Sequence, residues 1–273
     1  MKDVETIRAT FARLPELIDR EEAAQAILKL FADGKISVNV PRYGQIGNNL
    51  VFARYLKQVR LWLSEREGVR YEFWGVLHND ERVVLNFVFY FQINDEEFDY
   101  HKELHIPVSI LCETEGEAIR TARVYYNTSW IAGHNIVRPP MLNEDPSLRA
   151  SLPESERKYF DALWAADSDT ILNEVWAKDG YFMGTLCSFN EGPALRKTLE
   201  GLFEDGKNTE LRLCSAALMG NYLVVEYMNH RSGGRPNTPS SGLAIYHYNS
   251  EGKMYQVRLA GDSGFDHCLW PTL

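Results

Sequence analysis

The segments ETEGEAIRTARVYYN, residues 113–127, and YNSEGKMYQVRLAGD, residues 248–262, repeat one pattern at two places in the chain. Each opens with a polar turn that contains glycine and continues as a run typical of a β-strand. Laid over one another, they place Arg123 opposite Arg258. A second pair of segments, VVLNF and LVVEY, places Asn86 opposite Glu226. A repeat this long exceeds any solenoid unit and therefore indicates two duplicated domains.

The same order of predicted elements precedes these strands in both halves. The order is a region of helical periodicity, a short strand, another helix and a set of β-rich runs. Asn48 or Asn49, Pro153 and Ser168 are expected at helix starts. A Gly/Pro/Ser-rich loop is expected at 230–242. In the first half the predicted helices are 4–14, 19–31 and 48–67, and the strands are 35–40, 69–79, 82–93, 102–113 and 119–130. In the second half the helices are 153–167, 168–180 and 191–206, and the strands are 181–188, 209–220, 221–232, 241–249 and 254–262.

Helices followed by an antiparallel meander are typical of an α+β domain whose helices pack on one face of the sheet. We expect a first domain over 1–140, a Pro-rich linker over 141–152 and a second domain over 153–273. Strand alternation assigns a Phe-rich side of 82–93 to the helices, with Leu85, Phe87, Phe89 and Phe91. The matching side of the second domain carries Leu223, Val225, Tyr227 and Asn229.

Composition narrows the classes of function. The chain has 38 acidic and 29 basic residues and a formal charge of −9, so a nucleic acid partner is not expected. No apolar run reaches the length of about 20 residues that spans a bilayer, so no membrane partner is expected either. The four cysteines are scattered and the N-terminus lacks a secretory pattern, which favours a cytoplasmic protein. No motif predicts a cofactor.

The strand ending GEAIRTARVYYN and the connector TSWIAGHNIVRPPML, residues 128–142, resemble the nuclear transport factor 2-like or SnoaL-like superfamily. The resemblance covers the chain once per half. It implies two tandem cone-shaped domains, each with about three helices on a curved, mostly antiparallel sheet open at one end to a pocket. Members include ketosteroid isomerases, polyketide cyclases, epoxide hydrolases and dehydratases, and others that only bind ligands or proteins.

The resemblance also implies an Asp, or an Asp–Arg–Asp set, inside the cone of the enzymes. The inward positions expected here carry no acid: Ala122, Val124, Tyr126 and Asn39 in the first domain, and Val257, Leu259, Gly261 and Met183 in the second. The sequence therefore predicts apolar interiors without the usual acid/base residues.

Aromatic and polar residues on or near the inward faces are the predicted ligand-binding set. Trp130 and His134, with Arg138, form either a clamp between the domains, which we favour, or a lid over a pocket. The predicted ligand-binding residues are Phe87, Phe89, Tyr126, Trp130, His134, Tyr227, Asn229 and Tyr246.

Two further groups are candidates for chemistry. Glu226 and His247 form a general acid/base pair if their strands place them together, and otherwise belong to structural contacts. His101, Glu103 and His105 alternate along one strand and so share a face, which suits either a metal site or a polar strand edge.

The leading hypothesis is the binding of a small apolar or amphipathic molecule inside a cone. One alternative is a cyclase, isomerase or dehydratase that uses Tyr, His or Asn. Another is a non-catalytic scaffold for protein interactions. We expect the two domains to pack as an intrachain pseudo-dimer, or the chain to form a homodimer.

Overall fold

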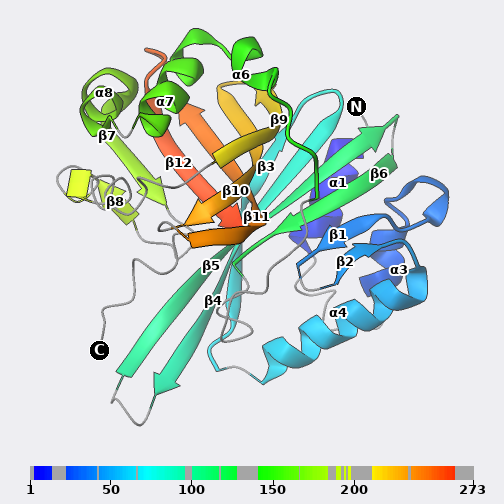
Figure 1. Cartoon of the computed structure of the whole chain (residues 1–273). Coiled ribbons are helices and arrows are strands. Elements are labelled where there is room, and N and C mark those ends of the chain that lie inside the picture. Colours follow the sequence, from blue (N-terminus) through cyan, green and yellow to red (C-terminus); the bar gives the residue numbers. More distant parts are fainter. Residues whose placement is uncertain are drawn as a thin grey trace. The chain divides into compact units, whose positions relative to one another are not determined.

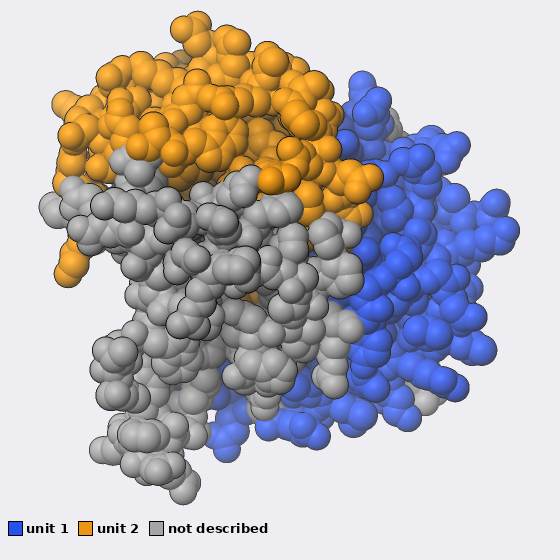
Figure 2. Space-filling model, in the orientation of Figure 1, with its two compact units in different colours: residues 1–126 blue, residues 127–273 orange. Residues whose placement is uncertain are grey.

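The chain divides into two compact units, Met1–Tyr126 (unit 1) and Asn127–Leu273 (unit 2), coloured blue and orange in Figure 2. Two domains were predicted, while the exact limits of the linker stay a prediction. No helix within the described ranges is long and apolar enough to cross a lipid bilayer. The computed structural model describes residues 3–13, 23–41, 43–65, 67–95, 100–116, 118–127, 141–165, 167–183, 189–191, 194, 196–197, 211–232 and 235–261.

Unit 1 begins with helices and ends with a long antiparallel meander (Figure 1). Its helices contact the sheet through α1 against β3 and β4 and through α4 against β2. Its elements are α1 (Asp3–Ala12), α3 (Ala23–Leu28), a 3-10 turn (Ala32–Gly34), β1 (Val38–Val40), β2 (Gly44–Ile46), α4 (Asn49–Ser64), β3 (Arg70–His78), β4 (Arg82–Asp95), β5 (Tyr100–Glu115) and β6 (Ala118–Tyr125).

Unit 2 repeats this order of elements, with short helices before the sheet. The segment that carries its third predicted helix, 191–206, lies mostly outside the described residues. Its elements are α6 (Leu148–Ser151), α7 (Glu154–Trp164), α8 (Ser168–Thr170), a π turn (Ile171–Val175), β7 (Trp176–Met183), β8 (Phe189–Glu191), β9 (Leu211–Met219), β10 (Tyr222–Ser232), β11 (Arg235–Tyr248) and β12 (Met254–Gly261).

The two sheets have the same strand order. In unit 1 it is β2-β1-β6-β5-β4-β3, and in unit 2 it is β8-β7-β12-β11-β10-β9. In each, the first strand pairs parallel with the last strand, and the other pairings are antiparallel. Asn39 pairs with Arg123 and Met183 pairs with Arg258, so the predicted superposition of the two halves is confirmed. Each unit is an α+β domain of the predicted class.

One face of each sheet packs on the helices, as the alternation predicts. In unit 1 Leu85 and Phe87 belong to the helix-side core, and Phe89 packs against it. In unit 2 Leu223, Val225 and Tyr227 occupy the corresponding side. Helix residues that complete these two cores include Ile7, Ile27, Leu28 and Phe52 in unit 1, and Tyr159, Phe160 and Ala162 in unit 2.

The helix α4 begins where the sequence indicates. The side chain of Asn48 accepts hydrogen bonds from the backbone N–H groups of Leu50 and Val51, at 2.9 and 3.2 Å. These bonds satisfy donors that the first turn of a helix leaves without partners. Asn49 acts differently: its side chain ties the helix start back to the backbone of Ile36 and Gly34.

Two segments of unit 2 differ from the prediction. The helix expected over 168–180 stops at Val175, and Trp176 already pairs with Met254 of β12, because ladder pairing and burial of Trp176 in the core override helical periodicity. The N-cap of this helix is Asp167 and not the predicted Ser168. The side chain of Asp167 accepts a hydrogen bond from the backbone N–H of Thr170. The loop expected at 230–242 is instead the outer part of the β10–β11 hairpin, with Ser232 paired to Arg235.

Gly242 of β11 lies directly beneath the ring of Tyr227, its partner on β10. A Cβ atom at position 242 would overlap the Tyr227 ring and hydroxyl. We therefore expect Gly242→Ala to lower the free energy of unfolding by ~1–3 kcal/mol, the usual cost of overpacking. Urea unfolding measures the effect. Gly47→Ala is the control, since nothing lies within 4 Å of the Cβ that it adds; an equal loss in both variants would contradict this packing.

Candidate functional site

The interior of unit 2 contains four buried tyrosines, here called the tyrosine cluster: Tyr159 on α7, Tyr227 on β10, and Tyr246 and Tyr248 on β11. The ring centroids of Tyr159 and Tyr246 are 5.3 Å apart, and their hydroxyls are hydrogen-bonded. Phe160 also belongs to this group, and its ring centroid lies 5.7 Å from that of Tyr246. The centre of the interior is therefore filled by aromatic rings.

A carboxylate lies at one end of this cluster. Glu156, in the first turn of α7, is only 4 % exposed and makes no ion pair with any described residue. Ser155 donates a hydrogen bond to it. Tyr159 and Phe160 follow three and four residues later, on the same helix face. The prediction that both interiors lack an ionisable acid is therefore wrong for unit 2, because the acid comes from a helix and not from the expected strand positions.

Tyr248 approaches Glu156 from the sheet. Burial, and then the negative charge of Glu156, raise the pKa of Tyr248 far above its usual value. The Tyr248 hydroxyl has the Glu156 carboxylate as its hydrogen-bond acceptor, but not in the geometry of a normal hydrogen bond. The indole N–H of Trp176 has no hydrogen-bond partner among the described residues. Trp176 and Tyr248 both pair with Met254, so they flank it on neighbouring strands. Two of the buried polar atoms that lack a normal hydrogen bond within the described residues, Tyr248 Oη and Trp176 Nε1, thus belong to the residues that flank Met254.

The chemistry open to this end of the interior is limited. Burial raises the pKa of Tyr159 and of Tyr246, so the phenols stay protonated and act as hydrogen-bond donors or acceptors. Glu156 can accept hydrogen bonds, balance a positive charge or take a proton. Among the described cysteines, burial raises the pKa of Cys112 to about 12 and of Cys214 to about 11, which leaves both thiols poor nucleophiles.

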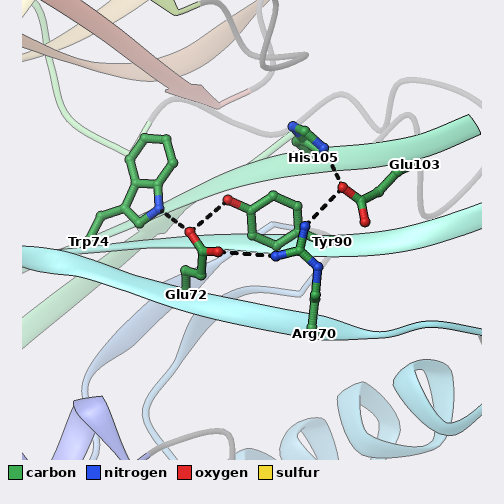
Figure 3. Close-up of polar contacts among 6 residues, drawn as sticks. All are labelled: Arg70, Glu72, Trp74, Tyr90, Glu103 and His105. Atoms are coloured by element: carbon green, nitrogen blue, oxygen red, sulfur yellow. Dashed lines mark hydrogen bonds and ion pairs between the residues drawn. The ribbon is translucent and has the colours of Figure 1, made fainter.

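The second candidate is a polar group on the other face of the unit 1 sheet, here called the outer-face cluster (Figure 3). Glu72 of β3 accepts from Trp74 Nε1 at 3.1 Å and from Tyr90 Oη at 2.9 Å. Strand register explains the arrangement, since Arg70 pairs with Tyr90 and Tyr90 pairs with His105. The members are Arg70, Glu72, Trp74, Tyr90, Glu103 and His105.

Arg70 joins the two carboxylates of the outer-face cluster. Its guanidinium donates to Glu72 at 3.1 Å and to Glu103 at 2.9 Å, and it stands 3.7 Å above the ring of Tyr90. Hydrogen bonds from Trp74 and Tyr90 lower the pKa of Glu72, and those from His105 and Arg70 lower the pKa of Glu103. Each member has a partner inside the cluster, so the cluster ties three strands together.

The predicted metal group coincides in part with this cluster. His105 Nε2 lies 2.8 Å from Glu103 Oε1, so two of the three residues are neighbours, as alternation along β5 implies. The same carboxylate is already held by Arg70. His101 is on β5 opposite Asn94, but its side chain lies outside the described part of the chain. Among the described residues no group of three or more metal-ligating side chains converges.

Glu226 and His247 are separated by the strand register. Glu226 pairs with Leu243, four residues before His247, which corresponds to about 13 Å along the strand. Glu226 is buried and accepts from Ser215 on β9. His247 stacks on Tyr222, with ring centroids 4.2 Å apart, and contacts Asn221 at 2.7 Å. The structure does not bring the two residues together as an acid/base pair.

The other predicted ligand-binding residues fall into three groups. Tyr227 and Tyr246 belong to the tyrosine cluster. Phe87 and Phe89 line the helix side of the unit 1 sheet, where they contact Phe73 and Tyr71. The rest are Tyr126, half-buried just after β6; Asn229, on β10 with an undescribed side chain; and Trp130 and His134, which with Arg138 lie outside the described residues.

Sequence reasoning missed Glu156, Tyr248, Tyr159 and Trp176. The available signal was the spacing Glu156, Tyr159, Phe160, which places an acid on the apolar face of a helix. Tyr248 continues the alternation of Ala244 and Tyr246 on the inner face of β11.

No protein-family model matches the chain, and no curated protein does so significantly. The following solved structures each cover less than half of this chain, which is about the length of one unit. An uncharacterized cystatin fold protein from Novosphingobium aromaticivorans is 20% identical over 39% of this chain and 94% of its own, with a TM-score of 0.35. A nuclear transport factor 2-like protein of unknown function from Mesorhizobium loti is 14% identical over 43% and 93%, with a TM-score of 0.34.

A de novo designed protein with the nuclear transport factor 2 fold is 14% identical, covers 44% of this chain and 90% of its own, and has a TM-score of 0.35. Two other matches are described as SnoaL-like and as having a ketosteroid isomerase-like fold. These matches name the superfamily that the sequence resembles. The fold itself is defined here by the strand order and helix packing of each unit, and the matches carry no information on activity.

The outer-face cluster permits a comparison of buried and exposed contributions. Tyr90 is 6 % exposed, while the Arg70 side chain is about half exposed at 49 %. We expect Tyr90→Phe to cost ~1 kcal/mol of unfolding free energy through the lost hydrogen bond to Glu72. Arg70→Met should cost less, because its ion pairs with Glu72 and Glu103 are exposed to solvent, which screens them. Urea unfolding of both variants checks the order, and the reverse order would contradict it.

His247 makes stability depend on pH. Burial lowers its pKa, so the unfolded chain binds a proton at higher pH than the folded chain does. The stabilisation from neutral His247 is present above the ordinary histidine pKa and is lost as pH falls through the lower, folded value. We expect the difference in unfolding free energy between wild type and His247→Gln to shrink from pH 7.5 to pH 5. Denaturant unfolding at both pH values tests this, and a constant difference would contradict it.

Proposed function

We propose that unit 2 binds a small amphipathic molecule at the end of its interior where Glu156 and Tyr248 lie. The observation that carries the proposal is a buried carboxylate, Glu156, that makes no ion pair with any described residue and lies beside the buried hydroxyl of Tyr248. Such groups are costly to bury unless a partner satisfies them. The surrounding rings supply the apolar surface that small-molecule sites generally offer around a few polar groups.

The interior of unit 1 supports this role less well. Its described core is made almost entirely of aliphatic and phenylalanine side chains, and its buried charged residue, Arg123, is paired with Glu113 at 2.8 Å. We therefore assign the ligand to unit 2.

Ligand-observed NMR on the full chain tests the proposal, with a panel of small amphipathic molecules that have neutral, cationic or anionic head groups. We expect at least one to bind the wild type. Tyr248→Phe should weaken that binding about tenfold, the value of one hydrogen bond of roughly 1.4 kcal/mol. Tyr255→Phe is the control, because Tyr255 contacts Tyr181 and His247 and is not part of the tyrosine cluster.

Either of two results would refute ligand binding at this site. One is that no member of the panel binds. The other is that Tyr248→Phe binds every ligand as tightly as the wild type and Tyr255→Phe do.

A second candidate is an enzyme of the cyclase, isomerase or dehydratase kind. The adjacency of Glu156 and Tyr248 favours it, since a carboxylate base beside a phenolic donor is one arrangement for moving a proton within a bound molecule. Glu156→Gln separates the two candidates. An enzyme would lose turnover while it keeps affinity, whereas a binding protein would change in affinity alone.

The cytoplasm remains the proposed location. The free thiols Cys112 and Cys214 are compatible with a reducing compartment. A pseudo-dimer of the two domains or a homodimer of the chain also stays a prediction.

A further inference from the structure

We infer that the molecule bound by unit 2 is a small organic ammonium ion, with Glu156 as its counter-charge and the tyrosine cluster as its aromatic wall. This inference rests on the proposed function and specifies the head group of the ligand.

The first reason is the charge balance of the interior. Among the described residues of unit 2, the buried charged side chains are Glu156 and Glu226, and no buried Lys, Arg or His accompanies them. Glu226 pairs with Leu243, so it lies on the sheet face opposite the core that holds Ala244 and Tyr246. Among the described residues, the helix side of the unit 2 sheet therefore holds one buried acidic side chain, Glu156, and no buried basic side chain. An anionic ligand would be repelled there, and a cation would remove the imbalance.

The second reason is that the helix itself compensates Glu156 only in part. A Glu at the third helical position normally reaches back to the backbone N–H of the N-cap residue. Here the N-cap is Pro153, which has no N–H, and Glu156 accepts from the Ser155 hydroxyl instead. The helix dipole adds a partial positive charge, which is smaller than the full charge of a carboxylate.

The nearby basic residues either bond to groups other than Glu156 or point away from the interior. Lys158 bonds to the carboxylate of Glu174, and Lys253 bonds to its backbone carbonyl. Arg157 is exposed, one residue beyond Glu156 and therefore on another side of the helix. None of these cations reaches the interior as the structure has it.

The third reason is the kind of wall that the site offers. Tyr159 follows Glu156 by one helical turn, and Tyr246 and Tyr248 approach from β11. The faces of aromatic rings attract cations, most strongly where water is excluded, and they suit alkylated ammonium groups. A metal ion would require several oxygen ligands. The described part of the chain contains no such group, so an organic cation fits better.

The test compares choline with 3,3-dimethylbutan-1-ol, in which a neutral carbon atom replaces the ammonium nitrogen and the shape stays the same. Binding of both to the full chain is measured by ligand-observed NMR or calorimetry at low and moderate salt. We expect choline to bind at least about tenfold more tightly, since a charge pair shielded from water is worth more than one in solvent.

Glu156→Gln should remove most of this preference, because the amide keeps the shape of the side chain and loses the charge. Tyr255→Phe, the control, should keep it. Circular dichroism and thermal unfolding establish that each variant folds. If Glu156→Gln does not fold, the comparison of the two ligands on the wild type alone decides the matter.

The outcomes distinguish this inference from the function on which it rests. If the alcohol binds the wild type as tightly as choline, the ammonium assignment is overturned and ligand binding stands. Binding of anionic members of the earlier panel alone would also overturn it. If no probe binds, both are overturned. A preference for choline that survives Glu156→Gln would mean that the carboxylate is not the counter-charge.

Discussion

The fold depends on one long-range pairing that occurs twice: the first strand of each unit lies parallel to the last. Asn39 meets Arg123 in unit 1, and Met183 meets Arg258 in unit 2. Each pairing joins strands that are far apart in sequence, so the sheet is complete only after the last strand has returned to the first. In unit 1 α4 lies between the two paired strands in sequence, while α1 and α3, and α6 to α8 of unit 2, precede the first strand. That arrangement creates an interior into which helix and sheet residues both project.

Most of this architecture could be predicted from the sequence, because period-two alternation and turn residues are local signals. The strand VVLNF shows its buried face directly, and Asn48 marks a helix start. The errors arose where a tertiary contact outweighs a local preference. Trp176 leaves the helical pattern for the ladder with Met254. The Gly/Pro/Ser-rich stretch extends a hairpin because its two arms pair with each other, Arg231 with Pro236 and Ser232 with Arg235.

The candidate site was predictable only in part, for a related reason. Alternation places Tyr227 and Tyr246 on the inner face, but it does not indicate which helix residue they meet. An acid in the first turn of a helix is ordinarily explained by the helix dipole and solvent exposure, so Glu156 attracts no notice in the sequence. Likewise Glu226 and His247 each suggest chemistry, and only the register shows that they are four residues apart along the ladder.

Duplication gives these differences a physical explanation. Two copies of one fold need not both support a polar interior, and here the tyrosine cluster and the buried carboxylate of Glu156 belong to unit 2. The core of unit 1 is apolar, its buried Arg123 is neutralised by Glu113, and its polar network lies on the outer face with every member partnered. Unit 1 thus has its polar groups arranged for stability. Unit 2 instead buries the carboxylate of Glu156 beside the hydroxyl of Tyr248, and the proposed ligand site rests on this pair.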